Sequence, residues 1–463
     1  MHPSNPVTRQ ATDLFMTESQ LPPDLAERFR REGVRDVECI FPDVSGYPRG
    51  KLMPAARFAA GQELRIAQAI PMQCVTGDYS FDPIFPDADP DLRLVPDAST
   101  LKRVPWSSVP RYMAIHDCVE LSGEHCAFAP RSVLQAVLAR YQALGLQPVV
   151  APEIEFYLTA ALTDPALPLA APQGRSGRAE AGQSAFSLNM LNELAPFWDE
   201  FHAALDSLGI QADTWIHEVG LTQFEINLMH GDALAAADQA FLFKLSAKEV
   251  ALKHGLNAVF MAKPLAGEAG SSMHLHQSLV DTQGHNVFSN PDGSASARFA
   301  HYIAGLQAYT PDLMLVYAPF VNSYRRYVTG SQAPINLHWG PDNRTTGLRV
   351  PISTPAARRV ENRIAGADAN PYLALAATLA AGLAGLEEGL TPTQAVVGNA
   401  YDQAHGLARD FNAAHAQMAA SDSAKRLLGA SFVQAYLAVK RLEHDSYLRE
   451  ISAWERRYLV AQV

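Results

Sequence analysis

The stretch APEIEFYL at residues 151–158 alternates acidic with apolar side chains, a pattern typical of a β-strand. Because side chains two positions apart on a strand share a face, Glu153 and Glu155 lie on one face, while Ile154 and Phe156 lie on the other. Neighbouring carboxylates repel each other unless a cation lies between them. The stretch therefore predicts either part of a cation site on a sheet or a strand whose acidic face is simply hydrated.

Two later strand-like stretches repeat this mixture of polar, metal-binding side chains and apolar neighbours. Imidazole and carboxylate groups are common metal ligands. A single glutamate on a strand is nevertheless more often a surface residue, and a histidine pair is more often structural. Each stretch alone is therefore ambiguous. The residues concerned are Glu218 and Glu225 within 217–227, and His274 and His276 within 273–278.

Arginines gather in the stretch RRVENR at residues 358–363, where Arg359, Glu361 and Arg363 fall on one strand face. The guanidinium fork binds carboxylates and phosphates through paired hydrogen bonds. A hydrated charged face is the alternative, but the flanking stretches are apolar. Glutamates, histidines and arginines together indicate metal-dependent phosphoryl chemistry, which relies on positioning and charge neutralisation. Further arginines stand at positions 325, 326, 344 and 349.

The composition is that of an acidic globular protein. Hydrophobic residues make up 48% and charged residues 18% of the 463 positions, enough for a large core and more than one domain. Lys and Arg total 37 against 48 Asp and Glu, and the net charge of −11 argues against a nucleic-acid partner. The longest apolar run, 372–386, is shorter than the roughly 20 residues that span a bilayer, so it predicts a buried helix and no membrane partner.

Cysteine usage and the N-terminus both favour a cytoplasmic protein. The four cysteines include no C-x-x-C pair and are too few for a disulfide framework in a chain of this length, which favours a reducing compartment. Residues 1–10 are polar and lack the apolar run of a secretory signal.

Helix and strand patterns alternate along the chain and predict an α+β fold in two units. Residues 1–17 are expected to be flexible, and the smaller unit then opens with an amphipathic helix over 21–33 and a strand over 34–41. The larger unit opens with an amphipathic helix over 130–145. A stretch rich in Pro, Ala and Gly at 159–184 predicts a long loop, and loops of that length are often functional.

Six ordered motifs resemble the glutamine synthetase family. The resemblance covers nearly the whole chain, and it implies a small N-terminal β-grasp domain over 18–124. A larger catalytic domain is implied over 125–463, with a curved antiparallel sheet that lines a funnel. It also implies a homo-oligomer, expected to be a dodecamer of two hexameric rings. The motifs are PEIEF (152–156), HEVGLTQFEIN (217–227), the run 263–276, NSYRR (322–326), DNRTTGLRVP (342–351) and RRVENRIAGADANPYLA (358–374).

Matched position by position, the resemblance implies a role for each candidate residue around two Mg²⁺ or Mn²⁺ ions. The first ion would be held by Glu155, Glu218 and Glu225, and the second by Glu153, His274 and Glu361. The substrate glutamate would be held by Gly270, Arg326 and Arg363. ATP would be bound by His276, Arg344, Arg349 and Arg359, and the residues closest to the chemistry would be Arg344, Gln332 and His276.

The implied activity is an ATP-dependent ligation through γ-glutamyl phosphate. Ammonia-using members carry a Phe-Asp-Gly-Ser-Ser segment and a flap that reads Glu-Ala-Pro. Here the first is missing near 71–77, although Asp78 or Asp82 could substitute, and the flap reads Gln332-Ala333-Pro334. The second half resembles the γ-glutamylpolyamine synthetase branch. The favoured amine is therefore a polyamine such as putrescine or a small alkylamine. An ammonia-using glutamine synthetase and a non-catalytic ring protein remain the alternatives.

Overall fold

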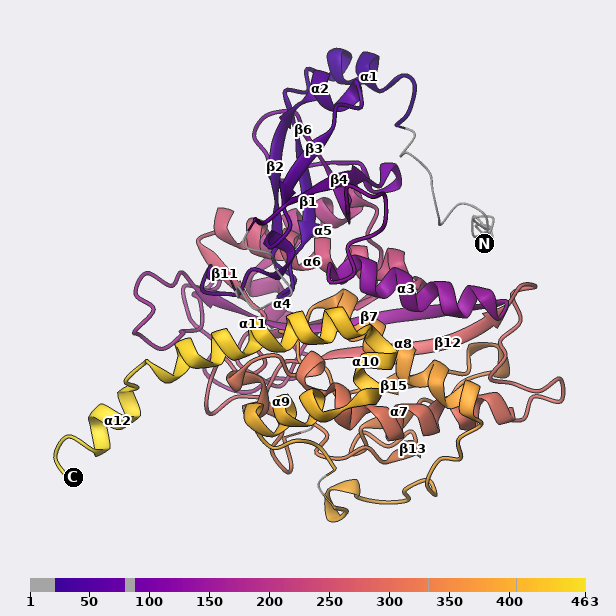
Figure 1. Ribbon diagram of the computed structural model, residues 1–463. Coiled ribbons are helices and arrows are strands. Elements are labelled where there is room, and N and C mark those ends of the chain that lie inside the picture. The colour runs from indigo at the N-terminus through magenta and orange to yellow at the C-terminus, as the bar shows by residue number, and fades with distance from the viewer. Residues whose placement is uncertain (1–20, 80–87, 332, 405) are drawn as a thin grey trace.

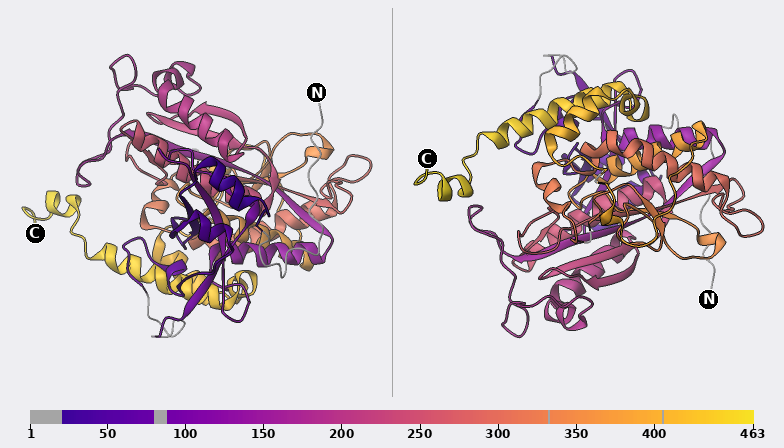
Figure 2. Two further views of the ribbon diagram at one scale, coloured as in Figure 1. Left: turned by 90° about the horizontal axis from the view of Figure 1, so that it is seen from above. Right: turned by 90° about the horizontal axis from the view of Figure 1, so that it is seen from below.

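The computed structural model describes residues 21–79, 88–331, 333–404 and 406–463 (Figure 1). The predictions made for residues 1–17, for Asp82 and for Gln332 lie outside the described residues. The fold is α+β, as the sequence predicts: a small N-terminal sheet stands on one side of a larger body built around a second sheet (Figures 1 and 2).

The N-terminal sheet is mixed, with strand order β2-β1-β6-β4-β3, and β5 pairs with β6. Helix α1 (Leu25–Glu32) covers it with its buried Leu25 and Phe29, and ends at Gly33, whose φ of 66° permits the left-handed C-cap. The other elements are β1 (Asp36–Pro42), β2 (Pro48–Pro54), α2 (Ala55–Ala59), β3 (Leu64–Ala67), β4 (Asp91–Pro96), β5 (Lys102–Arg103) and β6 (Arg111–Val119).

The second sheet has the order β13-β14-β15-β12-β7-β9-β8, and β10 and β11 also pair with β7. Its pairs are antiparallel except for β13 and β14, which run parallel, so the expected antiparallel sheet is mixed at one edge. The strands are β7 (Leu146–Ala160), β8 (Ala212–His217), β9 (Gln223–Leu228), β10 (Gly231–Asp232), β11 (Leu256–Val259), β12 (Met273–Asp281), β13 (Trp339–Pro341), β14 (Leu348–Val350) and β15 (Val360–Asn362).

The predicted buried helix over 372–386 is α8 (Pro371–Glu388), which packs closely against α7 (Ala297–Tyr317). A Cβ atom at Gly305 would lie 2.2 Å from the Ala381 carbonyl oxygen, so the two backbones approach closely only because that position is glycine. In the described part of the chain, no helix is both long and apolar enough to cross a bilayer.

The remaining helices complete the larger body and the C-terminal end. Residues 161–187 contain no helix or strand, in agreement with the predicted loop at 159–184. After α11 the chain leaves the body, and α12 projects from it in every view (Figures 1 and 2). The helices are α3 (Pro130–Ala143), α4 (Leu188–Glu193), α5 (Ala195–Leu208), α6 (Ala233–Lys253), α9 (Phe411–Ala420), α10 (Asp422–Leu428), α11 (Ala430–Leu448) and α12 (Ala453–Tyr458).

Candidate active site

Strand β7 separates an apolar face from an acidic one, as the alternation at 151–158 predicts. Ile154, Phe156 and Leu158 are fully buried, and the Phe156 ring lies 6.0 Å from Phe243 of α6. The opposite face carries Glu153 and Glu155. The hydrophobic face therefore fixes the strand against the helices, and this leaves the carboxylates on the other side of the sheet.

The register of the sheet brings the acidic side chains of neighbouring strands beside each other. Glu155 pairs with Glu225 of β9, and Glu153 pairs with His274 of β12. On the next strand pair, His276 lies opposite Glu361 of β15. We call Glu153, Glu155, Glu225, His274 and Glu361 the acidic cluster.

Three members of the acidic cluster form a compact group of possible metal ligands. His274 Nδ1 lies 2.8 Å from Glu153 Oε1 and 3.6 Å from Glu361 Oε1, and a ligand atom from each side chain lies within 4.8 Å of the other two. Burial and the charge of Arg363 lower the pKa of His274, which favours the neutral imidazole that binds metals. These are the residues that the family resemblance assigns to the second ion.

The group expected for the first ion is only partly assembled. Glu155 and Glu225 lie with His274 in a second set whose ligand atoms are all within 4.8 Å of one another. Glu218 is not part of that set, and its Oε2 accepts a hydrogen bond from the Val219 amide at 3.0 Å. Glu218 still acts on the cluster through its charge, which together with burial raises the pKa of Glu155.

The pKa values of the acidic cluster show that it has an excess of negative charge. Burial and the neighbouring carboxylates raise the pKa of Glu225 to about 11, and that of Glu155 to about 7. Burial alone would also raise the pKa of Glu361, but Arg363, together with the neighbouring His274 and His276, outweighs it and holds the value at about 2. An oxygen-rich set with one imidazole and unbalanced charge fits a hard divalent cation such as Mg²⁺ or Mn²⁺.

Two residues that the sequence analysis missed hold Glu155 in place. Ser272 donates to both carboxylate oxygens, from its hydroxyl at 2.6 Å and from its amide at 2.8 Å. Gln223 Nε2 donates to the Gly270 carbonyl at 3.0 Å and lies 3.5 Å from Glu155 Oε2. Gln223 stands two positions before Glu225, so its place on the same strand face was a signal that could have identified it.

The two arginines expected to hold glutamate are buried next to the acidic cluster. Arg363 pairs with Glu361, and Arg326 donates to the Ile364 carbonyl. The Arg326 Nε is buried and has no hydrogen-bond partner among the described residues. A Cβ atom at Gly270 would lie 2.5 Å from Arg326 Cγ, so glycine is required for this arginine to lie where it does.

The arginines expected on the phosphate side are arranged differently from one another. Arg359 Nε donates to His276 Nδ1 at 3.3 Å, so these two lie together. Arg349 instead pairs with Glu361 at 2.8 Å and with Asp342 at 2.6 Å, which orients the Glu361 carboxylate. Arg344 is exposed, and its charge opposes the burial that raises the pKa of Glu218.

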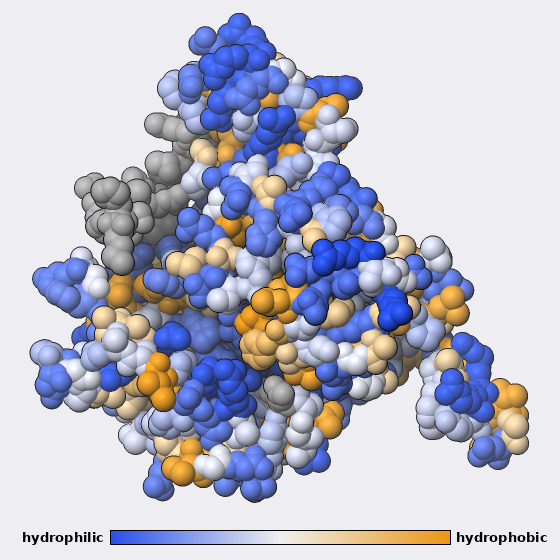
Figure 3. Space-filling model, turned by 180° about the vertical axis from the view of Figure 1, so that it is seen from behind, coloured by the Kyte–Doolittle hydropathy of each residue, from blue (hydrophilic) through white to orange (hydrophobic). Residues whose placement is uncertain are grey.

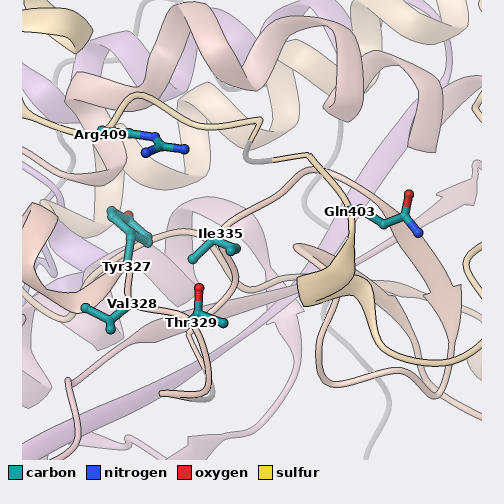
Figure 4. A pocket seen from close by; sticks show the side chains of 6 residues that line it. All are labelled: Tyr327, Val328, Thr329, Ile335, Gln403 and Arg409. Atoms are coloured by element: carbon teal, nitrogen blue, oxygen red, sulfur yellow. The ribbon is translucent and has the colours of Figure 1, made fainter.

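A separate surface pocket of about 520 Å³ lies beside the segment that follows Arg326 (Figure 4). Figure 4 shows side chains from residues 327–335 in the middle, with Arg409 above Tyr327 and Gln403 on the far side of Ile335. None of its lining residues belongs to the acidic cluster. They are Tyr327, Val328, Thr329, Ile335, Gln403 and Arg409.

Comparisons with known proteins match most of the chain. Residues 127–459 match the family described as "Glutamine synthetase, catalytic domain". The chain is 38% identical to the glutamate–isopropylamine ligase of a Pseudomonas species, over 80% of this chain and 82% of the relative. It is 35% identical to the gamma-glutamylputrescine synthetase PuuA of Escherichia coli, over 80% of this chain and 79% of that relative. Among solved structures, a GmaS/ADP complex superposes with a TM-score of 0.81 at 30% identity, covering 94% of this chain and 99% of that one.

Proposed function

Because the chain belongs to the glutamine synthetase family, we propose that it joins the γ-carboxylate of glutamate to an organic amine in an ATP-dependent reaction. The observation that carries this proposal is the acidic cluster, built on neighbouring strands of one sheet and bordered by the buried arginines Arg326 and Arg363. Carboxylates for cations and arginines for anions are what a phosphoryl transfer between two anions needs.

We propose that the cluster divides into two cation sites, one with Glu155, Glu218 and Glu225 and one with Glu153, His274 and Glu361. Mg²⁺ or Mn²⁺ bound there would neutralise the charge that develops on the ATP phosphates. In the first site, Glu218 would have to move closer to Glu155 and Glu225 to share an ion with them, since it lies outside their compact set. Arg349 and Arg363 hold Glu361 between them, so its two oxygens are already oriented.

The arginines supply the remaining positive charge. We propose that Arg326 and Arg363 orient the glutamate, and that Arg344, Arg349 and Arg359 lie on the phosphate side with His276. Arg349 acts there mainly through Glu361, since its guanidinium already pairs with that carboxylate and with Asp342. The glutamate γ-carboxylate attacks the terminal phosphorus of ATP, and ADP leaves. The amine then attacks the acyl carbon of γ-glutamyl phosphate, and phosphate leaves with the new amide bond in place.

The choice of an organic amine over ammonia rests on two points. The sequence has Gln332 where the flap of ammonia-using members carries a glutamate, and a neutral amide cannot act as a general base. Two relatives with 38% and 35% identity are named for isopropylamine and putrescine. A glutamine synthetase of Pyrococcus abyssi is 31% identical, so ammonia remains the second candidate.

An assay of ADP release with glutamate, ATP and a panel of amines tests the proposed reaction. We expect release with a small alkylamine or a diamine such as putrescine, and little release with ammonia. Ammonia as the best acceptor would favour the second candidate. No release with any acceptor would favour a non-catalytic protein of the same fold.

The variant Gln332→Glu is expected to raise the catalytic efficiency with ammonium relative to the best amine by about tenfold. A carboxylate would attract a small cation in a partly dehydrated site and could accept its proton. The measurement is the ratio of kcat/KM for the two acceptors in both proteins. An unchanged ratio, in a variant with normal KM values for ATP and glutamate, would show that this residue does not select the acceptor.

The variant Gly270→Ala is expected to raise the KM for glutamate by about tenfold while the KM for ATP stays within about twofold, because an added methyl group must displace Arg326. Steady-state kinetics with each substrate varied in turn check this. Gly267→Ala is the control, because a Cβ atom there meets no atom within 4 Å. Equal KM values for glutamate in both variants would show that Gly270 does not belong to the glutamate site.

We also propose that the protein is a homo-oligomer, with two hexameric rings as the expected form, and that it acts in the cytoplasm. The exposed apolar side chains of the C-terminal segment support the first point: Ile451, Trp454 and Val460 are 61–77% exposed, and this segment stands apart from the body (Figure 3). The four free cysteines agree with a reducing compartment. Sedimentation of the full chain gives the assembly mass.

A further inference from the structure

The turn that connects β8 to β9 is held by hydrogen bonds of its own and by two carboxylates from other loops. We call residues 218–223 the Glu218 turn. Each of its main-chain amides donates to an acceptor, and two of these acceptors are carboxylates of distant loops. Leu221 N donates to Glu268 Oε2 at 3.1 Å, and Thr222 N donates to Glu180 Oε2 at 2.6 Å. Two consecutive amides of the turn are therefore held by carboxylates from two different loops.

Glu180 differs from the rest of its loop. The residues on either side of it, 175–179 and 181–186, are all exposed, yet the Glu180 side chain is only 3% exposed. Besides the Thr222 amide, its Oε2 contacts His217 Nε2 at 3.2 Å. Burying a carboxylate is unfavourable unless hydrogen bonds or a positive charge compensate for it. An exposed loop that buries one carboxylate against one turn therefore has a specific attachment there.

The attachment lies at the one residue of the turn whose backbone is strained. Thr222 has a φ of 55°, in the left-handed region that β-branched residues rarely adopt. Its hydroxyl donates to the Leu158 carbonyl at 2.6 Å, so the turn is tied to β7 on one side and to the loop on the other. On the loop side, His217 Nδ1 lies 2.9 Å from the Ser184 carbonyl oxygen, which adds a second tie beside Glu180.

The Glu218 turn also reaches the candidate glutamate pocket. Gly220 N donates to Gln223 Oε1 at 3.0 Å, and Nε2 of the same Gln223 side chain donates to the Gly270 carbonyl. A displacement of the turn would therefore move Glu218 and loosen Gln223, and through Gln223 the support of Glu155 and Gly270.

We propose that Glu180 is a positioning residue for the cation site: the loop at 159–184 uses its carboxylate to hold the Glu218 turn, and so sets where Glu218 and Gln223 lie. This inference rests on the proposed function, because it assigns Glu218 and Glu155 to a bound cation. Among the described residues, Glu180 forms hydrogen bonds only with the Thr222 amide and with His217.

The test uses Glu180→Ala, Glu180→Gln and a matched control in the full-length protein. The control is Glu193→Ala, because Glu193 also supports the same loop, by accepting from Ser176 N at 2.9 Å, but has no hydrogen bond to the Glu218 turn. Glutamine at 180 can still accept from Thr222 N but removes the negative charge that faces His217. The first readout is Mn²⁺ binding by electron paramagnetic resonance, and the second is hydrogen exchange of the amides at 218–223.

We expect Glu180→Ala to weaken Mn²⁺ binding at one site by at least tenfold and to speed exchange across the Glu218 turn, whereas Glu193→Ala changes neither. A loss of this size is typical when a partner of a metal ligand is removed. The Mn²⁺ affinity and exchange rates of Glu180→Gln should lie between those of the wild type and Glu180→Ala. This variant is used for the test if the alanine variant does not fold. Wild-type Mn²⁺ affinity in the Glu180 variants would overturn the positioning role alone. A wild-type protein that binds no Mn²⁺ would overturn the proposed cation site and this role with it.

Discussion

The variant Glu155→Gln is expected to lower amine-dependent ADP release by about a hundredfold or more, while the protein still folds. Even residues that only support a metal ligand contribute about 10- to 100-fold, so removal of a ligand should cost at least as much. A neutral amide is a weaker ligand for a hard cation than a carboxylate. It also fits Ser272 poorly, because both carboxylate oxygens accept hydrogen bonds from that residue and an amide nitrogen cannot.

The measurements for this variant are kcat at saturating Mg²⁺ and the number of Mn²⁺ ions bound per chain. Glu193→Gln is the control for loss of one carboxylate outside the cluster. Near-wild-type turnover of Glu155→Gln at ordinary Mg²⁺ concentrations would remove Glu155 from the cation site. A wild-type Mn²⁺ count with lost turnover would instead assign Glu155 a role other than metal binding.

The second large effect expected is that a divalent cation stabilises the protein much more at pH 8 than at pH 5. Without a cation, burial and neighbouring carboxylates raise the pKa of Glu155 to about 7 and that of Glu225 to about 11. A raised carboxyl pKa means that the folded protein holds its proton at a pH where the unfolded chain has released it. The free energy of unfolding of the metal-free protein therefore falls as the pH rises from about 4.5, through about 7 for Glu155 and on toward about 11 for Glu225.

The shift of Glu155 alone contributes about 3 kcal/mol of this loss by pH 8, and the shift of Glu225 adds to it. A bound Mg²⁺ or Mn²⁺ takes the place of the protons, so the loss should disappear when the site is saturated. Below about pH 4.5 the lowered pKa of Glu361 acts in the opposite direction, because its stabilising ion pairs are lost on protonation. The informative window is therefore pH 5–8.

Thermal unfolding with Mn²⁺ and with a chelator, at several pH values in this window, measures the effect. Other titrating groups, such as buried Lys244, contribute to both curves and cancel in the difference between them. The Mn²⁺-induced rise in Tm should grow with pH in the wild type and should be nearly flat in a Glu155→Gln, Glu225→Gln double variant. A rise that is the same at pH 5 and pH 8 in the wild type would contradict the assignment of these carboxylates to a cation site.

Several features could be predicted from the sequence because they depend on local periodicity. The alternation at 151–158 gave the two faces of β7, and the apolar run at 372–386 gave the buried helix α8. The stretch at 159–184, without periodicity, is a loop in the structure. Ordered motifs then carried the family assignment, which the match over residues 127–459 confirms. The roles of individual site residues, of Gln332 above all, stay predictions.

Other features were decided only by tertiary structure. The pairing of Glu155 with Glu225, of Glu153 with His274 and of His276 with Glu361 depends on strand registers. The family resemblance assigns Arg349 to the phosphate side, which stays a prediction, and only the structure shows that it pairs with Glu361 and Asp342.

Glu180 shows most clearly that the local sequence does not reveal contacts between distant segments. It stands in a loop without periodicity, about forty residues from Thr222, and nothing in the local sequence marks it as buried. Periodicity reports which face a side chain takes within its own element, because that depends on the backbone geometry of the element alone. Which charged groups then meet across elements is decided by how the sheet and its loops pack, since buried charges must find partners wherever the fold brings them.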